Sequence, residues 1–475
     1  MTVMALSGPL TDRGFIVALG VAVVFVLYLL LHRSPRLAVG FWITVLCFVP
    51  VWIGVGLGLG GNFYVPAASG AALVVTAALL PTARFRLTLT DGLVVLLILV
   101  GTAALLTGNK AIALSFLLSL CTYFVVGFAL GRLAPSRVDI RWIYGAIGVA
   151  FTIVSVLAII EFLTGVNFFT LWRANNISFA TWGSLQSRGG VLRAEGAFGH
   201  SIALGSSLAL AIPLTLATQF RFWIRGVMVL LMLIATTLTF SRIGIIDALL
   251  GLALSILFLA EALSIRRRIV LATAGVILSL ALLPVVNTVF TDAGTEATGS
   301  AAYRGNLLSL ISDMNLIGVA SSAHTSASGQ VYFGNFRSID SQLILSGLSG
   351  GLIVLAVVVV ALLVAIGFVL SGRATAPTIA VVAQIPAFAT VALITQYSIF
   401  VWFVVGLAVA TQLARETPHN EIAPSHLLFV PGEMHRSLRH LVPFHAVRST
   451  QPVPPARPAT TPRKHNRMSD HHDVK

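Results

Sequence analysis

Long apolar runs separated by short polar breaks cover most of the chain from Gly14 to Ala414. A helix that crosses the hydrocarbon core of a bilayer needs about 20 predominantly apolar residues, and runs of this kind recur along the sequence. The first run, Gly14 to Leu31, is followed by no small-residue cleavage site, so we expect a retained span rather than a signal peptide. The pattern predicts an all-α polytopic membrane protein, with residues 1–414 as its transmembrane domain.

Arginine-rich breaks alternate with breaks that carry few cations, which orients the predicted helices. Lys and Arg are enriched in short cytoplasmic loops, so the basic breaks are placed inside. These breaks begin at His32, Arg84, Arg132, Arg221, Arg266 and Arg373. The alternation predicts about 13 helices, with about 12 or 14 as alternatives, an external N-terminus and a cytoplasmic C-terminus. It also predicts two long extracytoplasmic loops, at about 164–200 and 291–339.

Composition agrees with a membrane protein and sets the last segment apart. The chain is 57% hydrophobic and only 10% charged. Cys47 and Cys121 lie inside apolar runs, where they fit small hydrophobic side chains better than a disulfide or a metal pair. Residues 415–475 are rich in Pro, Arg and His and cannot bury a core. Their composition predicts a disordered cytoplasmic tail that faces anionic lipid or binds a partner.

The two long loops carry arginines on the side of the membrane where arginine is unusual. Their cationic and histidine side chains are Arg173, Arg188, Arg193, His200, Arg304, His324 and Arg337. Such a cluster indicates an anionic ligand, and at an outer membrane face a lipid-linked phosphate is the natural candidate. We expect the two loops to meet over a cavity that brings Arg193 and Arg304 close to Arg242, which stands in a tight outer turn.

Alternative interpretations remain for the single residues. His200 could be a helix-start residue satisfied by loop backbone, and His324 could belong to a flexible serine-rich loop. Asp340 could cap the helix predicted to begin at Ser341. The membrane-embedded carboxylates Glu161 and Asp247 lie near predicted outer helix ends rather than at mid-membrane depth, which makes a proton-coupled transporter a less favoured interpretation.

Several motifs occur in an order that points to one family. They are Arg193–His200, Thr237–Gly244, Arg304, Asn306–Ile311, Asn315–Gly318 and Ser338–Leu343, the last followed by Gly347, Gly350 and Gly351. In this order, over about Phe151 to Leu370, the chain resembles the O-antigen ligase and O-antigen polymerase superfamily of bacterial envelope glycosyltransferases. The amino-terminal helices match the family only in hydropathy.

The resemblance implies a multi-pass enzyme of the bacterial cytoplasmic membrane that moves a glycan from undecaprenyl pyrophosphate to an acceptor hydroxyl, without a metal or cofactor. Arginines would stabilise the pyrophosphate leaving group, which assigns Arg193, Arg242, Arg304 and Arg337 to substrate binding. The acceptor hydroxyl needs a base within reach, for which Asp340, His324 and His200 are the candidates. The partners are the lipid-linked donor, the glycan acceptor, the bilayer and other polysaccharide-assembly proteins, with no nucleic acid.

The resemblance leaves open whether the chain is a polymerase or a ligase. Two functions outside the family, a flippase and a scaffold, also remain. Ligases of the superfamily typically carry His-Asn where this chain has Asp340-Ser341, and the polymerase branch more often has Asp, so polymerisation of repeat units is favoured over transfer to a lipid or protein acceptor. A lipid-linked oligosaccharide flippase would also bind pyrophosphate, but its cations would be distributed through a central cavity. A non-catalytic scaffold of an export complex would need no converging arginines.

Overall fold

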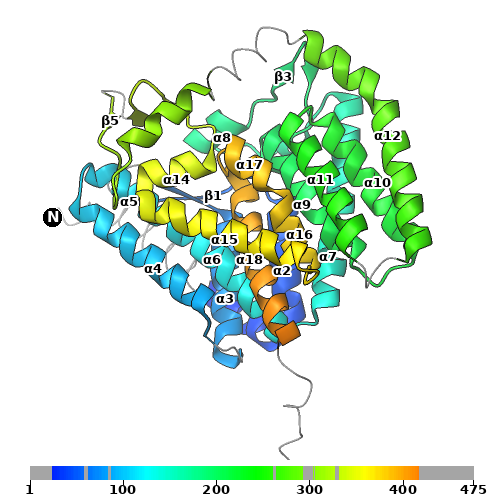
Figure 1. The fold of residues 1–475 in the computed structure, drawn as a ribbon, viewed down its shortest axis with the longest axis horizontal. Coiled ribbons are helices and arrows are strands. Elements are labelled where there is room, and N and C mark those ends of the chain that lie inside the picture. Colours follow the sequence, from blue (N-terminus) through cyan, green and yellow to red (C-terminus); the bar gives the residue numbers. More distant parts are fainter. Residues whose placement is uncertain are drawn as a thin grey trace, which may run out of the picture. The chain divides into compact units, whose positions relative to one another are not determined.

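The computed structural model describes residues 24–57, 63–83, 87–259, 264–292, 303, 305–326 and 331–416. The described part folds mostly into helices (Figure 1). Arg304, the beginning of the first apolar run and the predicted tail from 417 onward lie outside the described residues.

Within the described residues, five helical segments are long and apolar enough to cross a membrane. They are Leu89–Leu106, Lys110–Ser136, Ile140–Thr164 (α7), Leu352–Leu370 (α15) and Thr395–Glu416 (α18). The first contains α4 (Leu89–Ala103), and the second contains α5 (Lys110–Ser119), the π-helical turn η3 (Leu120–Val125) and α6 (Val126–Leu133). These segments fit a helical membrane protein, whereas the total number of spans and their orientation stay predictions.

Further helices complete the bundle. They are Val24–Arg33, α2 (Pro35–Phe48), α3 (Ala67–Leu79), α9 (Ser201–Leu216), α10 (Phe222–Leu238), α11 (Arg242–Phe258), α12 (Ile265–Asp292), α14 (Gln342–Gly350), α16 (Ala376–Ala383) and α17 (Ile385–Thr390). Pro386 follows the break between α16 and α17, where a ring without an N–H interrupts the helical ladder. Residues 376–416 therefore form two short helices followed by α18.

Helix α9 lies in the core of the bundle. Every residue from Ser201 to Leu216 except Ile202 is buried, because α7, α10, α11, α16 and α18 all pack against it. A helix that is apolar all round is typical of such a central position. It meets α11 at Gly205 and Gly244, where a Cβ added to Gly244 would lie 3.0 Å from backbone atoms of Gly205. The two glycines therefore allow the two backbones to approach closely.

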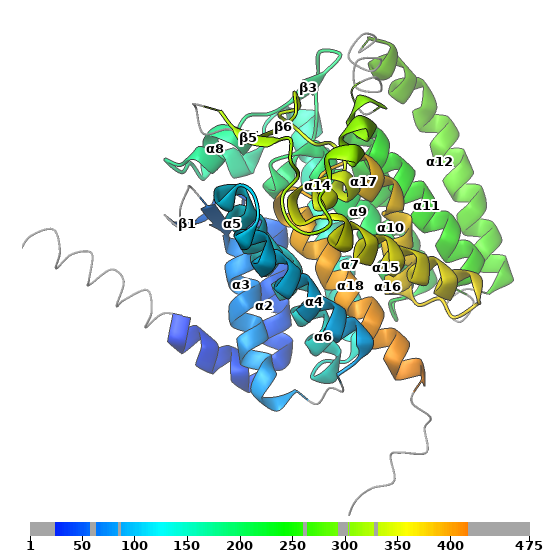
Figure 2. The same ribbon diagram turned by 60° about the vertical axis from the view of Figure 1, so that its left-hand side comes forward.

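One end of the bundle carries short strands and helical turns in addition to the helix ends. In the described residues, β1 (Gly54–Leu57) pairs with β2 (Phe63–Pro66), β3 (Ser187–Arg188) with β4 (Val191–Leu192), and β5 (Ala323–Thr325) with β6 (Val331–Phe333), all antiparallel. Helix α8 (Ile177–Trp182) lies beside them, and Figures 1 and 2 both show α8, β3 and β5 at the same end, here called the loop end. The described part of the chain is thus mostly helical, as predicted, and carries three small hairpins at its loop end.

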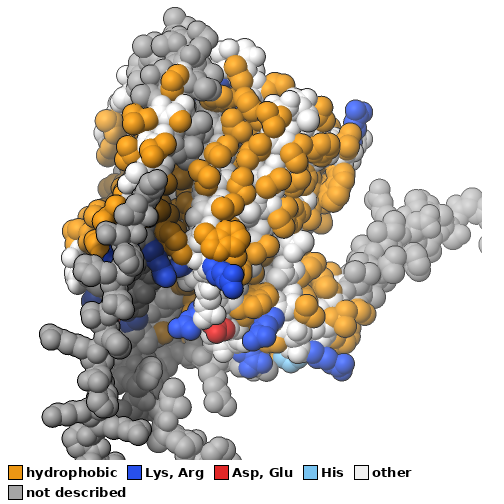
Figure 3. Space-filling model, turned by 90° about the vertical axis from the view of Figure 1, so that its right-hand side faces the viewer, with side chains coloured by type: hydrophobic (Ala, Val, Ile, Leu, Met, Phe, Trp, Pro, Cys, Tyr) orange, Lys and Arg blue, Asp and Glu red, His pale blue; other side chains and the backbone are white. Residues whose placement is uncertain are grey.

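Hydrophobic side chains cover the middle of the face drawn in Figure 3, and Lys and Arg side chains gather at its lower end, away from the loop end. Helix α7 begins at the lower end, where Asp139 caps it by accepting a hydrogen bond from the N–H of Arg141 at 2.8 Å. An apolar belt with a basic rim at one end is the surface expected for helices in a bilayer whose basic loops lie together.

Candidate functional site

The turn between α10 and α11 is a tight structure at the loop end. Phe240 adopts a positive φ of 45°, which is uncommon for a residue other than glycine. Ser241 caps α11, because its Oγ accepts a hydrogen bond from the N–H of Gly244 at 3.1 Å. Arg242 is the first residue of α11 and is exposed. The predicted tight turn is therefore present, and it presents Arg242 at the surface of the loop end.

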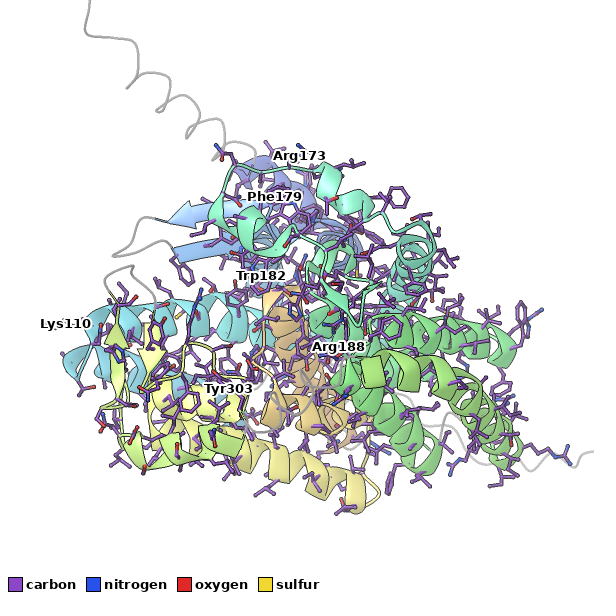
Figure 4. All side chains as sticks on the ribbon, turned by 90° about the horizontal axis from the view of Figure 1, so that it is seen from above. Lys110, Arg173, Phe179, Trp182, Arg188 and Tyr303 are labelled. Atoms are coloured by element: carbon purple, nitrogen blue, oxygen red, sulfur yellow. The ribbon has the colours of Figure 1, made fainter. Side chains whose placement is uncertain are left out.

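The first long loop docks on this turn through two of its arginines. Arg193 donates from Nε to the carbonyl oxygen of Thr239 at 2.8 Å, and Arg188 donates from Nη1 to that of Phe240 at 3.1 Å. The N–H of Ala194 donates to the carbonyl oxygen of Leu238 at 3.2 Å. Arg188, Arg193 and Arg242 are here called the arginine turn. Figure 4 shows Arg188 close to the green helices of this turn, and Arg173 farther out.

The arginines of the turn differ in exposure. Arg193 is buried, with 7% of its surface exposed, whereas Arg188 is half-buried and Arg242 is exposed. Arg337 is exposed in the segment after β6. Arg193 and Arg188 thus bond to the two backbone carbonyl groups of residues 239 and 240, just before Arg242, while the expected approach of the Arg193 and Arg242 side chains stays a prediction. Arg304, the third predicted member, lies outside the described residues.

A buried pair of carboxylates holds the loop next to the arginine turn. Glu161, near the end of α7, accepts hydrogen bonds from the N–H groups of Glu195 at 3.0 Å and Gly196 at 2.9 Å. Glu195 in turn accepts from the N–H of Gln186 at 3.1 Å. Both carboxylates are almost fully buried. The sequence had marked Glu161 as a residue near an outer helix end, but it assigned no role to Glu195.

Burial raises the pKa of Glu195 to about 8. The hydrogen bond from Gln186 lowers this pKa, the neighbouring charge of Glu161 raises it, and Arg193 lowers it. A carboxyl group with this pKa is largely protonated at neutral pH. It therefore cancels little of the positive charge of the arginine turn.

His200 is the N-cap of α9, as the helix-start interpretation predicted. Its Nδ1 accepts a hydrogen bond from the N–H of Ile202 at 3.2 Å, and Trp182 contacts its ring edge-to-face at 5.8 Å. Burial and, to a smaller extent, the nearby charge of Arg193 lower the pKa of His200 to about 4. The imidazole is therefore neutral at neutral pH. Because Nδ1 is the acceptor, Nε2 carries the proton and can donate, which favours anion binding over base catalysis.

The second long loop holds His324 in a hairpin rather than in an irregular segment. His324 lies in β5 opposite Tyr332 of β6, and the two rings stack at 5.6 Å. Its side chain is exposed, with Nδ1 3.3 Å from the carbonyl oxygen of Ser322. Residues 323–325 therefore form a strand, and the role of His324 as a base stays a prediction.

Asp340 does not cap the helix that follows it. Helix α14 begins at Gln342, one residue later than expected, and its N-cap is Ser341, whose Oγ accepts from the N–H of Ile344 at 3.3 Å. Asp340 is half-buried, and its Oδ1 accepts a hydrogen bond from the hydroxyl of Ser338 at 2.9 Å. The capping interpretation of Asp340 is wrong, because Ser341 is the N-cap of α14.

Hydrogen bonds connect the Asp340 segment to the start of α18. The N–H of Gln342 donates to the carbonyl oxygen of Val391 at 2.9 Å, and the N–H of Leu393 donates to Oε1 of Gln342 at 2.9 Å. Gln396, in the first turn of α18, donates to the carbonyl oxygens of Val49 at 2.7 Å and Ala197 at 3.2 Å. The first turn of α18 thus lies between the segment that holds Asp340 and the loop that holds His200.

Beside this connection lies a cavity of about 240 Å³ that includes residues of the first long loop but none of the second. The expected meeting of both loops over one cavity stays a prediction. Among the described residues, no three His, Cys, Asp or Glu side chains are grouped so that they could hold a metal ion. Comparison with known protein families and with curated proteins finds no match for the chain.

Proposed function

We propose that this protein transfers a glycan from undecaprenyl pyrophosphate to an acceptor sugar hydroxyl at the outer face of the bacterial cytoplasmic membrane, polymerising repeat units. The observation that carries the proposal is the arginine turn. Arg188 and Arg193 donate to the carbonyl groups of Phe240 and Thr239 in the turn that leads to the exposed Arg242, and the neutral imidazole of His200 lies near Arg193. A pyrophosphate leaving group needs fixed donors of this kind, because its negative charge grows in the transition state.

In this proposal the three arginines have different roles. Arg242 is exposed and binds the pyrophosphate, while Arg193 is buried on the carbonyl of Thr239 and positions the turn. Arg188, half-buried on the next carbonyl, borders the site. Nε2–H of His200 supplies a neutral donor close to the same charge. This assignment keeps Arg242 as predicted and changes Arg193 from a substrate ligand to a positioning residue.

Asp340 serves as the base toward the acceptor hydroxyl. It is tied to the first turn of α18 through Gln342, and it is free of a capping role because Ser341 caps α14. A side chain at the fixed start of a helix loses less conformational entropy on acting than one on an exposed hairpin. For that reason Asp340 is preferred to His324.

The test in cells uses a strain that lacks this chain. Deletion should stop polymer formation and leave single lipid-linked repeat units on the outer leaflet, and expression of the wild-type chain should restore polymer. Repeat units accumulating on the inner leaflet would point to a flippase instead. Polymer of normal length that is no longer joined to its lipid or protein acceptor would point to a ligase. Either result would contradict the polymerase proposal.

A further inference from the structure

The cavity at the loop end is formed by four elements that are distant in the sequence. It lies between the β1–β2 hairpin, the π-helical turn η3, helix α8 and the start of α18. Its lining residues are Val51, Tyr64, Pro66, Tyr123, Ser178, Trp182, Leu393, Ile394, Thr395 and Ser398. A volume of about 240 Å³ is below the range of about 300–1,000 Å³ that is typical of sites for drug-sized molecules. The cavity therefore suits a single small ring.

Two residues that line this cavity carry buried hydroxyl groups. Thr395 is 7% exposed, and among the described residues its Oγ1 has no hydrogen-bond partner; the same holds for Oη of Tyr64. A buried hydroxyl without a hydrogen-bond partner destabilises a folded protein. Thr395 also adopts a positive φ of 51°, which is strained for a β-branched residue. Strain and unsatisfied hydroxyls together are typical of a binding site rather than of a packing defect.

The remaining lining combines aromatic rings with further hydroxyls. Trp182, Tyr64 and Tyr123 provide aromatic surface, while Ser178 and Ser398 add two more groups that both donate and accept. Burial raises the pKa of Tyr64 to about 12, so its phenol keeps its proton and can donate. None of the lining side chains carries a formal charge at neutral pH. A neutral ring that has both apolar faces and many hydroxyls matches this lining, and a phosphate does not.

We propose that this cavity is a subsite for one monosaccharide ring, held by Thr395 and Tyr64 through its hydroxyls and by Trp182 through its apolar face. Trp182 also contacts His200, and Leu393 in the cavity wall binds Gln342 beside Asp340. Figure 4 shows Trp182 over the start of the orange helix α18. The assignment of this ring to the lipid-linked donor or to the acceptor glycan rests on the proposed function. The binding of a monosaccharide ring in the cavity does not depend on that function.

The experiment measures binding by the full-length chain, purified in a detergent without a sugar headgroup. The probes are methyl glycosides of glucose, galactose, mannose, rhamnose and the two common N-acetylhexosamines, followed by tryptophan fluorescence and calorimetry. At least one glycoside should bind saturably. Thr395→Val keeps the branched shape and removes only the hydroxyl, and Tyr64→Phe does the same for the phenol. Each should weaken Kd by about three- to tenfold, the effect of one lost hydrogen bond.

Matched controls lie outside the cavity. Thr181→Val changes an exposed threonine of α8, and Tyr332→Phe changes a phenol of β6, and both should leave Kd unchanged. Cyclohexylmethanol has a ring of the same size without the ring hydroxyls and should bind at least tenfold more weakly. The proposal is overturned if the folded protein binds none of the glycosides saturably, if cyclohexylmethanol binds as well, or if Thr395→Val and Tyr64→Phe leave Kd unchanged. If the chain binds a glycoside but forms no polymer, only the proposed function is contradicted. If the chain forms polymer but binds no glycoside, only the proposed subsite is contradicted.

Discussion

Two arginines that look alike in the sequence differ in what surrounds them. Arg193 is buried and donates to the carbonyl of Thr239, whereas Arg242 begins α11 with an exposed side chain. Both stand in motifs with glycine and small polar residues, so sequence order alone could not separate a positioning residue from a substrate ligand. The distinction depends on the loop folding back over the turn, a long-range contact that no local pattern encodes.

Arg242→Lys should lose most of the transfer activity although the positive charge remains. An ammonium group cannot reproduce the paired donors of guanidinium, and losing one good transition-state donor costs about 3 kcal/mol, on the order of a hundredfold in rate. Arg173→Lys is the matched control, because Arg173 is an exposed arginine of the first long loop without a part in the arginine turn. Polymer length in cells that produce equal amounts of each variant measures the effect. Normal polymer with Arg242→Lys would remove Arg242 from the site.

Substitutions at Asp340 and Ser341 should distinguish a loss of transfer activity from a loss of stability. Asp340→Asn should abolish transfer with little change in the unfolding temperature, because Ser341 caps α14. Ser341→Ala should instead cost about 1 kcal/mol of stability, as the loss of a helix cap does, and leave the base in place. His324→Ala should be mild. Activity and thermal unfolding of the three purified variants give the comparison, and an active Asp340→Asn beside an inactive His324→Ala would move the base to the hairpin.

Glu195 should make the protein less stable at alkaline pH. Its pKa is about 8 in the folded chain and near the ordinary 4.5 when unfolded, so its stabilising contribution is complete below pH 4.5. That contribution is lost as pH rises through 8, because the unfolded chain releases a proton that the folded chain retains. Glu195→Gln cannot ionise and should therefore lose less stability between pH 5 and pH 8, by on the order of 2 kcal/mol.

The measurement for Glu195 is the unfolding temperature of the wild type and Glu195→Gln across this pH range. His200 has a lowered pKa and acts in the opposite direction, adding stability that is present above pH 6.5 and lost as pH falls through 4. Because both proteins contain His200, its contribution cancels in the comparison. Parallel pH profiles would show that Glu195 is ionised in the folded chain.

At the scale of the elements, hydropathy predicted the helices well and the loop structures poorly. Apolar runs determine where helices such as α7 and α15 lie, because burial in lipid or in the core requires internal backbone hydrogen bonds. The hairpin β5–β6 and helix α8 depend instead on contacts between distant segments, such as Asn176 donating to the carbonyl oxygen of Trp52 at 2.9 Å. The sugar-sized cavity was missed for the same reason, since its lining comes from four segments.

The crossing of α9 and α11 should tolerate no side chain at Gly244. The added methyl of Gly244→Ala would lie 3.0 Å from backbone atoms of Gly205, which cannot move aside as a flexible side chain can. Overpacking of this kind costs about 1–3 kcal/mol and displaces the start of α11, so both stability and transfer should fall. In α10, Gly226 has nothing within 4 Å of an added Cβ. Gly226→Ala should therefore be neutral or stabilising by about 0.5–1 kcal/mol. An unfolding temperature unchanged by Gly244→Ala would contradict this packing.

At the scale of the whole molecule, the apolar belt and the basic rim agree with a helical membrane protein that keeps its loop end and its basic end apart (Figure 3). The sequence could predict this separation because the positive charge of the short breaks and the length of the loops are local properties. It could not predict which cations of the first long loop bond to the α10–α11 turn. The docking of residues 188–194 on this turn fixes Arg188 and Arg193 on the carbonyl groups that precede Arg242.

In the proposed function, the arginine turn supports glycan transfer from a lipid pyrophosphate. The most direct measurement combines the purified full-length chain with a synthetic undecaprenyl-pyrophosphate-linked repeat unit and follows both products. The proposal predicts longer lipid-linked glycans and one undecaprenyl pyrophosphate released per bond formed, with the rate about a hundredfold lower for Arg242→Lys. No elongation by folded wild-type protein that binds the lipid-linked substrate, or an equal rate for Arg242→Lys, would contradict it.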